Sequence, residues 1–167
     1  MFMPLVDYEG GGKAAVFEPL HQNLKPFTFG LAQYLGAGVA ACYRGFRLYD
    51  SQDTRDHVLE WVTFYKKYRG ILGGDIIHIK WPTMQSMDAW LHVNPTGHYK
   101  GLVMVFNPTS DKITKQLTIP LYYTGLVKTA LVSEAGQQWR QEHLTRDYKI
   151  RVDIKLEPET LTYLLVK

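Results

Sequence analysis

The stretch YKIRVDIKL, residues 148–156, alternates apolar and polar side chains with a period of two. In an extended chain, one face then carries only apolar residues, namely Ile150, Val152, Ile154 and Leu156. The opposite face carries the charged residues Arg151, Asp153 and Lys155. One apolar and one polar face is typical of an antiparallel strand that covers a core on one side and meets water on the other. We therefore predict an antiparallel sheet in this part of the chain.

The same kind of segment recurs on both sides of this stretch. Further candidate strands of about six residues cover residues 75–81, 89–94, 101–106, 113–119, 127–133, 138–143 and 160–166. Turn sequences such as NPTG, NPTSD and EAG separate several of them. Short strands at regular spacing are typical of a sandwich or barrel. We predict an antiparallel β-sandwich of about eight strands over residues 74–167.

Residues 1–73 have a different, largely helical pattern. In residues 54–69, the apolar side chains of Val58, Trp61, Val62 and Tyr65 recur at helical spacing, and Ser51 or Asp53 can cap the helix. A second, nearly all-apolar helix is predicted over residues 31–43, with Gly36 and Gly38 allowing close packing, and a short strand over residues 1–6. The predicted fold class is α+β, mainly β, with a boundary at Gly73 and Gly74.

Composition and charge exclude several classes of protein. The 167 residues carry a formal net charge of +3, with Lys and Arg spread along the chain, which argues against nucleic acid as a partner. No apolar run is long enough to predict a membrane span. Cys42 is the single cysteine, so the chain holds no disulfide framework of its own, and in the predicted helix it is interpreted as a packed apolar residue.

No metal or cofactor site is predicted. The histidines, at positions 21, 57, 78, 92, 98 and 143, form no HxH or HExxH pattern, and no phosphate-binding glycine loop is present. The region after residue 74 is rich in aromatic residues: Trp81, Trp90, Tyr99, Phe106, Tyr122, Tyr123, Trp139, Tyr148 and Tyr163. Such side chains either fill the space between two sheets or, where exposed, stack on sugar rings.

Glycine and charge are unevenly distributed. Residues 1–45 hold seven of the 14 glycines but only six charged residues. A freestanding amino-terminal region normally carries more charge, because much of it faces water. This segment therefore has the composition of the inside of a larger structure, and we expect the isolated chain to self-associate through it.

One group of polar residues follows the first predicted strand. Asp7, Tyr8 and Glu9 come directly after it and precede the loop Gly10–Gly12. Carboxylates at the end of a buried strand, followed by a glycine-rich loop, are common at the mouths of βα-barrel active sites, although a solvated surface turn has the same composition. Asp7 and Glu9 would lie on one face roughly 7 Å apart, within the range of glycosidase carboxyl pairs. Because both come from one strand, contact with a substrate is favoured over catalysis.

Several blocks together resemble a known family. The runs PLVDYEGGGKAAVFEPL, LAQYLGAGVAACYRGFRLYD and VLEWVTFYKKYRGIL, followed by DIIHIKWP, LHVNP and GLVMVFNP, are similar to the end of a bacterial glycoside hydrolase of the alpha-galactosidase-like (melibiase) type. In such enzymes the last part of a catalytic (β/α)8 barrel runs directly into an antiparallel β-sandwich. The stretch MQSMD, residues 84–88, departs from the family pattern.

The resemblance implies a carboxy-terminal piece, with residues 1–73 as the end of the barrel and residues 74–167 as the sandwich. Its partners would be the upstream catalytic barrel of the same polypeptide and carbohydrate, and the parent enzyme could be periplasmic or secreted. The catalytic aspartates of the family come from earlier barrel strands, so no catalytic residue is predicted in this chain. Asp7, Tyr8, Glu9 and Arg44 would face the sugar pocket as substrate-binding residues. The alternative is a carbohydrate-binding or adhesion module without hydrolytic activity.

Overall fold

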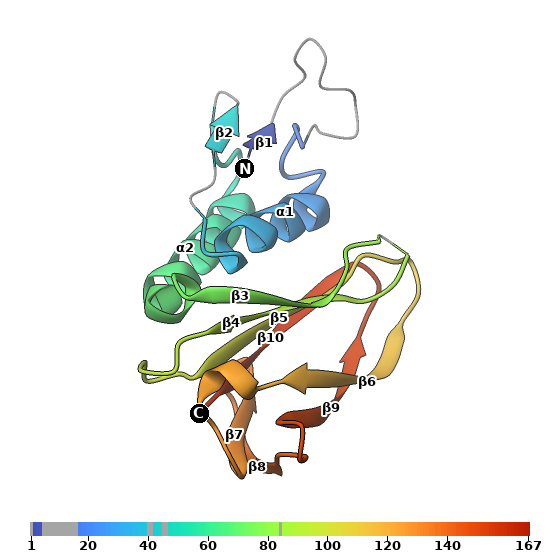
Figure 1. The fold of residues 1–167 in the computed structure, drawn as a ribbon. Helices are drawn as coiled ribbons and strands as arrows, with labels where there is room; N and C mark the ends of the chain where they lie inside the picture. Colours follow the sequence, from blue (N-terminus) through green and yellow to red (C-terminus); the bar gives the residue numbers. More distant parts are fainter. Residues whose placement is uncertain (1, 5–16, 40–41, 45–46, 84) are drawn as a thin grey trace. The chain divides into compact units, whose positions relative to one another are not determined.

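The computed structural model describes residues 2–4, 17–39, 42–44, 47–83 and 85–167. The chain divides into two compact units, residues 1–69 and 70–167. Two α-helices and two short strands precede eight longer strands (Figure 1). This composition confirms the α+β, mainly β, fold class.

The second unit is built from two antiparallel sheets. The larger has the order β3-β4-β5-β10-β7-β8, and the smaller pairs β6 with β9. The strands are β3 (Asp75–Lys80), β4 (Asp88–Val93), β5 (Gly101–Asn107), β6 (Ile113–Pro120), β7 (Thr129–Glu134), β8 (Trp139–His143), β9 (Lys149–Leu156) and β10 (Thr160–Val166). Each of the eight predicted strands is confirmed, with ends that differ by two residues at most.

The core of this unit lies between its two sheets. One cluster of buried side chains includes Leu91, Val103 and Leu164 from the larger sheet, together with Leu117 and Val152 from the smaller one. The stretch for which we predict one buried and one solvent-exposed face is β9. Its apolar residues are at most 5% exposed, and its charged residues Arg151, Asp153 and Lys155 face solvent. The central strands β4 and β5 are buried on both faces instead.

Two Asn-Pro-Thr sequences form matching turns at the ends of β4 and β5. The Oδ1 atom of Asn94 accepts hydrogen bonds from Thr96 Oγ1 (3.1 Å) and the Gly97 amide (3.0 Å). The Oδ1 atom of Asn107 accepts hydrogen bonds from Thr109 Oγ1 (2.7 Å) and the Thr109 amide (3.0 Å). Such local side-chain bonds stabilise the turn against continued strand. The motifs that carry much of the family resemblance therefore have a structural role here.

The first unit contains a parallel strand pair. The strand β1 (Phe2–Pro4) pairs with β2 (Cys42–Arg44) in the register Phe2 to Cys42 and Pro4 to Arg44. The helix α1 (Leu24–Gly36) connects the two strands, and α2 (Gln52–Leu72) follows the second. Parallel strands need such a crossover, so the order β1-α1-β2-α2 is a repeated strand–helix unit.

The predicted helix over residues 31–43 is partly wrong. The helix α1 begins seven residues earlier and ends at Gly36, and Cys42 and Tyr43 belong to β2. Gly38 has a φ of 72°, and its amide bonds to the carbonyl of Leu35, so this glycine ends the helix. Gly36 lies inside the helix as predicted, whereas Gly38 and Cys42 lie beyond its end.

The helix α2 is confirmed and is longer than predicted. Ser51 caps it, because its Oγ accepts a hydrogen bond from the amide of Thr54 at 3.3 Å, whereas Thr54 Oγ1 accepts one from the Ser51 amide at 3.0 Å. This reciprocal pair is a capping box. The buried stripe runs through Val58, Trp61, Phe64 and Tyr68, whereas the predicted members Val62 and Tyr65 are half-buried. Within the described residues, no helix is both long and apolar enough to cross a membrane.

Candidate functional site

The parallel pair of the first unit defines one edge at which loops meet. Because β1 and β2 run in the same direction, the loops that leave their carboxyl ends start on the same side. Ligand sites of strand–helix folds lie at this edge. Residues 17–23 come before α1 and residues 47–51 before α2, so both segments belong to these loops.

Three of the four predicted substrate-binding residues, Asp7, Tyr8 and Glu9, lie outside the described residues. Arg44 is the last residue of β2, which places its backbone at the carboxyl edge of the strand pair. The sugar-facing role of these four residues stays a prediction.

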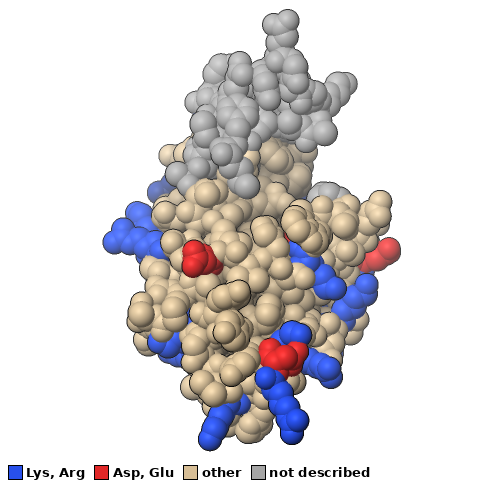
Figure 2. All heavy atoms as spheres, in the orientation of Figure 1, with Lys and Arg blue, Asp and Glu red and all other residues tan. Residues whose placement is uncertain are grey.

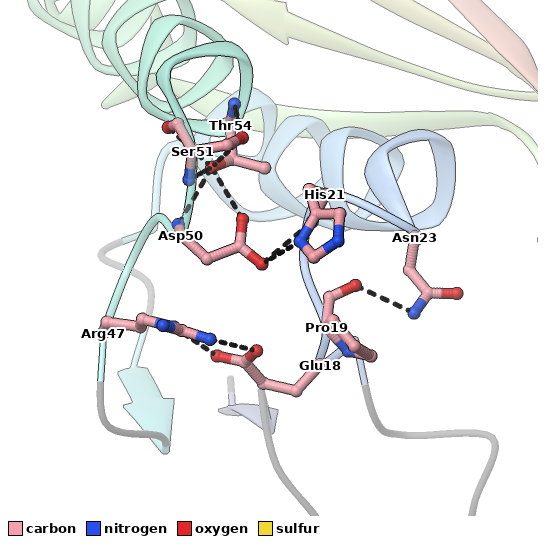
Figure 3. Close-up of polar contacts among 8 residues, drawn as sticks. All are labelled: Glu18, Pro19, His21, Asn23, Arg47, Asp50, Ser51 and Thr54. Carbon is pink, nitrogen blue, oxygen red and sulfur yellow. Dashed lines mark hydrogen bonds and ion pairs between the residues drawn. The ribbon is translucent and has the colours of Figure 1, made fainter.

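An arginine–glutamate pair joins the two loops. Arg47 donates from Nε to Glu18 Oε1 at 3.3 Å and from Nη2 to Glu18 Oε2 at 3.2 Å (Figure 3). This two-bonded geometry raises the pKa of the Arg47 guanidinium above its ordinary value. Because the partners are 29 residues apart, the pair ties the loop after β1 to the loop after β2.

A histidine–aspartate pair makes a second link between the same loops. His21 Nδ1 lies 2.7 Å from Asp50 Oδ2, and the same oxygen accepts the His21 backbone N–H at 3.1 Å. The other oxygen of Asp50 accepts a hydrogen bond from Thr54 Oγ1 at 3.1 Å. The Asp50 side chain is 2% exposed, whereas that of His21 is 51% exposed. The pair therefore consists of a buried carboxylate and a half-exposed imidazole (Figure 3).

Asp50 is ionised at neutral pH. Burial opposes its ionisation, but the hydrogen bonds from the His21 ring, the His21 amide and Thr54 outweigh burial and hold its pKa at about 2. A carboxylate with no proton can only accept hydrogen bonds. The proton between Asp50 and His21 therefore belongs to the imidazole.

Sequence reasoning missed Glu18, His21, Arg47 and Asp50. Their position in the chain could have indicated them, since all four lie between a strand and the following helix, as most of the predicted site residues do. No local sequence pattern indicates which of them pair, because the partners in each contact are 29 residues apart. Asp50 directly precedes Ser51, one of the two predicted helix caps.

In the part of the chain that the structure describes, no three His, Cys, Asp or Glu residues are close enough to hold a metal ion. On the face shown in Figure 2, Lys and Arg side chains lie at several separate places among uncharged surface. This mixed distribution does not single out an anionic partner.

The aromatic residues of the second unit range from buried to exposed, with Tyr99, Trp139, Tyr148 and Tyr163 half-buried. Trp90 and Phe106 are buried and stack on each other with ring centroids 4.7 Å apart. Trp81 is 76% exposed, and its ring lies nearly parallel to that of His78, with centroids 5.5 Å apart. Tyr122 and Tyr123 are also exposed. The exposed rings are the ones best able to stack on a sugar.

The chain shares its fold with parts of glycoside hydrolases. No family model and no curated protein matches the sequence. The galactosidase domain of an alpha-galactosidase–sucrose kinase matches over 99% of this chain and 22% of its own, with a TM-score of 0.58 and 18% identity. An alpha-amylase from Geobacillus thermoleovorans, solved with acarbose, matches over 88% of this chain and 35% of its own, with a TM-score of 0.57 and 15% identity.

A debranching enzyme from Nostoc punctiforme shows the same relation, with a TM-score of 0.59 and 10% identity over 91% of this chain and 33% of its own. The chain thus spans about a third or less of the length of these enzymes. At such low identity the likeness concerns the fold alone.

Proposed function

We propose that this chain is the noncatalytic carboxy-terminal region of an alpha-galactosidase-like glycoside hydrolase. Residues 1–73 would complete the catalytic (β/α)8 barrel, and residues 74–167 would form a sandwich that packs against the barrel and stabilises it. The observation that carries the proposal is the parallel order β1-α1-β2-α2 followed at once by an antiparallel two-sheet domain. A galactosidase domain matches this whole succession.

The first unit supports the proposal because its architecture is incomplete by itself. A (β/α)8 barrel repeats strand and helix eight times and closes only when all its parallel strands are paired. Among the described residues, β1 and β2 pair only with each other, over three residues each. Further parallel strands, supplied by an upstream segment of the same polypeptide, would complete such a sheet.

The second unit supports a stabilising role because it has a core of its own. Side chains from both of its sheets form one buried cluster. Burial of apolar surface contributes about 25 cal/mol per Å². A domain with its own core can support a neighbouring barrel without depending on it for folding.

The acids of the described loops support the absence of catalysis in this chain. Glycosidases use two carboxyl groups, one on each side of the scissile bond. Glu18 is paired with Arg47, and Asp50 accepts hydrogen bonds from His21 and Thr54. Both carboxylates are engaged in contacts between or within the loops, which favours a catalytic pair from the upstream barrel strands.

The first test is an activity assay with aryl glycosides. We expect the purified 167-residue chain to release no aryl leaving group from an aryl α-galactoside above the rate of a mock preparation from the same host. The polypeptide encoded by the full reading frame upstream should hydrolyse an aryl glycoside. Turnover by the purified chain would contradict the proposal, and so would an upstream reading frame without barrel strands.

A carbohydrate-binding or adhesion module is the second candidate, and the exposed ring of Trp81 favours it. Gel retardation of the chain by galactans separates the two functions. The stabilising role predicts that polysaccharide affects the mobility of the unmodified chain and of Trp81→Ala equally. Retardation that disappears in Trp81→Ala but persists in the control Leu131→Ala, at another exposed apolar residue, would favour the module.

A further inference from the structure

The His21–Asp50 pair has features that a purely structural contact does not require. A link between two loops is already provided by Arg47 and Glu18. In the second pair, only the aspartate is buried, and half of the histidine side chain remains open to solvent. Figure 3 shows that the second ring nitrogen of His21 points away from Asp50.

Asp50 determines which ring nitrogen of His21 carries the proton. Its carboxylate is held in place by Thr54, which is itself buried. Thr54 Oγ1 donates a hydrogen bond to Asp50 Oδ1 and accepts one from the Asp50 backbone amide. Because an ionised carboxylate only accepts hydrogen bonds, His21 Nδ1 must donate. The neutral imidazole then has an unprotonated Nε2, which accepts hydrogen bonds.

The position of this acceptor matches that of a ligand-binding group. His21 follows β1 and Asp50 follows β2, so the pair lies in the loops at the carboxyl edge of the parallel strands. Within the described residues, no protein donor to His21 Nε2 is found. An oriented acceptor that is half-exposed at this edge is suited to a ligand that donates from an O–H group.

We propose that His21 is a sugar-binding residue, whose Nε2 accepts a hydrogen bond from a sugar hydroxyl group, and that Asp50 is its positioning residue. The choice of a sugar as the hydroxyl donor rests on the proposed function. The orientation of the imidazole rests on the contacts of His21, Asp50 and Thr54 alone.

The first measurement is the protonation of the imidazole. In the ¹⁵N-labelled 167-residue chain, long-range ¹H–¹⁵N spectra of the histidine rings should show the proton of neutral His21 on Nδ1. Asp50→Asn removes the charge that holds this proton, and we expect the population with the proton on Nε2 to increase. Exchange protection of α1 and α2 is measured in the same variant, because loss of loop order would also move the proton toward Nε2. A neutral His21 with its proton on Nε2 in the unmodified chain would overturn the proposal.

The second measurement is a titration of the same chain with methyl α-D-galactopyranoside and, separately, methyl α-D-glucopyranoside. We expect a saturable shift of the His21 Nε2 resonance with at least one of the two sugars. The rings of His98 and His143, which lie in the second unit, serve as internal controls and should not move.

Two variants separate binding from folding. His21→Asn keeps a side-chain N–H near the position of Nδ1 and removes Nε2, so it should preserve exchange protection of α1 and α2 and weaken sugar binding about tenfold. His21→Gln places its amide nearer the position of Nε2 and should lose the contact with Asp50.

Sugar binding that leaves His21 Nε2 unmoved, or that survives unchanged in His21→Asn, would overturn the assignment of His21. The absence of any sugar response would overturn it as well. Neither result bears on the activity of the longer polypeptide, which tests the proposed function separately.

Discussion

Replacing Asn107 by aspartate should lower the free energy of unfolding of the chain by about 3 kcal/mol or more. Asn107 is fully buried, and its Nδ2 donates to the carbonyls of Asp111 and Glu157 at 2.8 Å each. Asn107→Asp has almost the same shape but puts an oxygen in place of this donor. Two carbonyls then lose their partner and face either a buried charge or a carboxyl group with a single proton.

The same substitution at Asn94 is the matched control. Asn94 occupies the equivalent position of the other Asn-Pro-Thr turn, but it is only half-buried and donates to one described carbonyl, that of Gly70, at 3.0 Å. Asn94→Asp should therefore cost only about 1 kcal/mol. Urea unfolding, monitored by tryptophan fluorescence, measures the free energy of unfolding of both variants. Equal losses in the two variants would mean that burial of the amide does not determine the effect.

Replacing Gly74 by alanine should cost about 3 kcal/mol. Gly74 connects α2 to β3, and a Cβ atom at this position would lie 2.1 Å from the carbonyl oxygen of Val93 and 3.1 Å from that of Ile71. Both atoms belong to the backbone, so the clash is relieved only if β4 or the end of α2 moves. The distance, and no unusual dihedral angle, is the reason for glycine at this position.

Gly70 provides a control of opposite sign in the same region. A Cβ atom there would meet nothing within 4 Å, and the residue lies in the last turns of α2. Gly70→Ala should therefore leave the stability unchanged or raise it by up to about 1 kcal/mol through helix propensity. Thermal and urea unfolding of both variants give the comparison. A destabilised Gly70→Ala, or a stable Gly74→Ala, would contradict the packing at this junction.

The strands of the second unit were predictable because their signal is local. In β9, apolar Ile150 and Val152 alternate with charged Arg151 and Asp153. This alternation involves only neighbouring residues and arises whenever one face of a strand is buried. The helix α2 was predictable for the same reason. Two members of its buried stripe were predicted wrongly. The sequence does not distinguish Phe64 and Tyr68, which are buried, from the predicted Val62 and Tyr65, because the two pairs are similarly apolar.

The end of α1 shows where local patterns fail. Residues 31–43 are apolar almost throughout, so periodicity does not reveal that a helix stops and a strand begins within them. The positive φ of Gly38 and the pairing of Cys42 with Phe2 decide this point. The second is a contact across 40 residues, which no local pattern reports.

By itself, the sequence determined the fold class, the eight antiparallel strands and the helix before them, because the alternation of apolar and polar residues depends only on which face is buried. Only the tertiary structure decided which polar residues meet at the carboxyl edge of β1 and β2. Glu18 with Arg47 and His21 with Asp50 are brought together by the parallel pairing of two strands and the crossover between them. A contact between side chains 29 residues apart follows from that geometry and leaves no periodic trace in the chain.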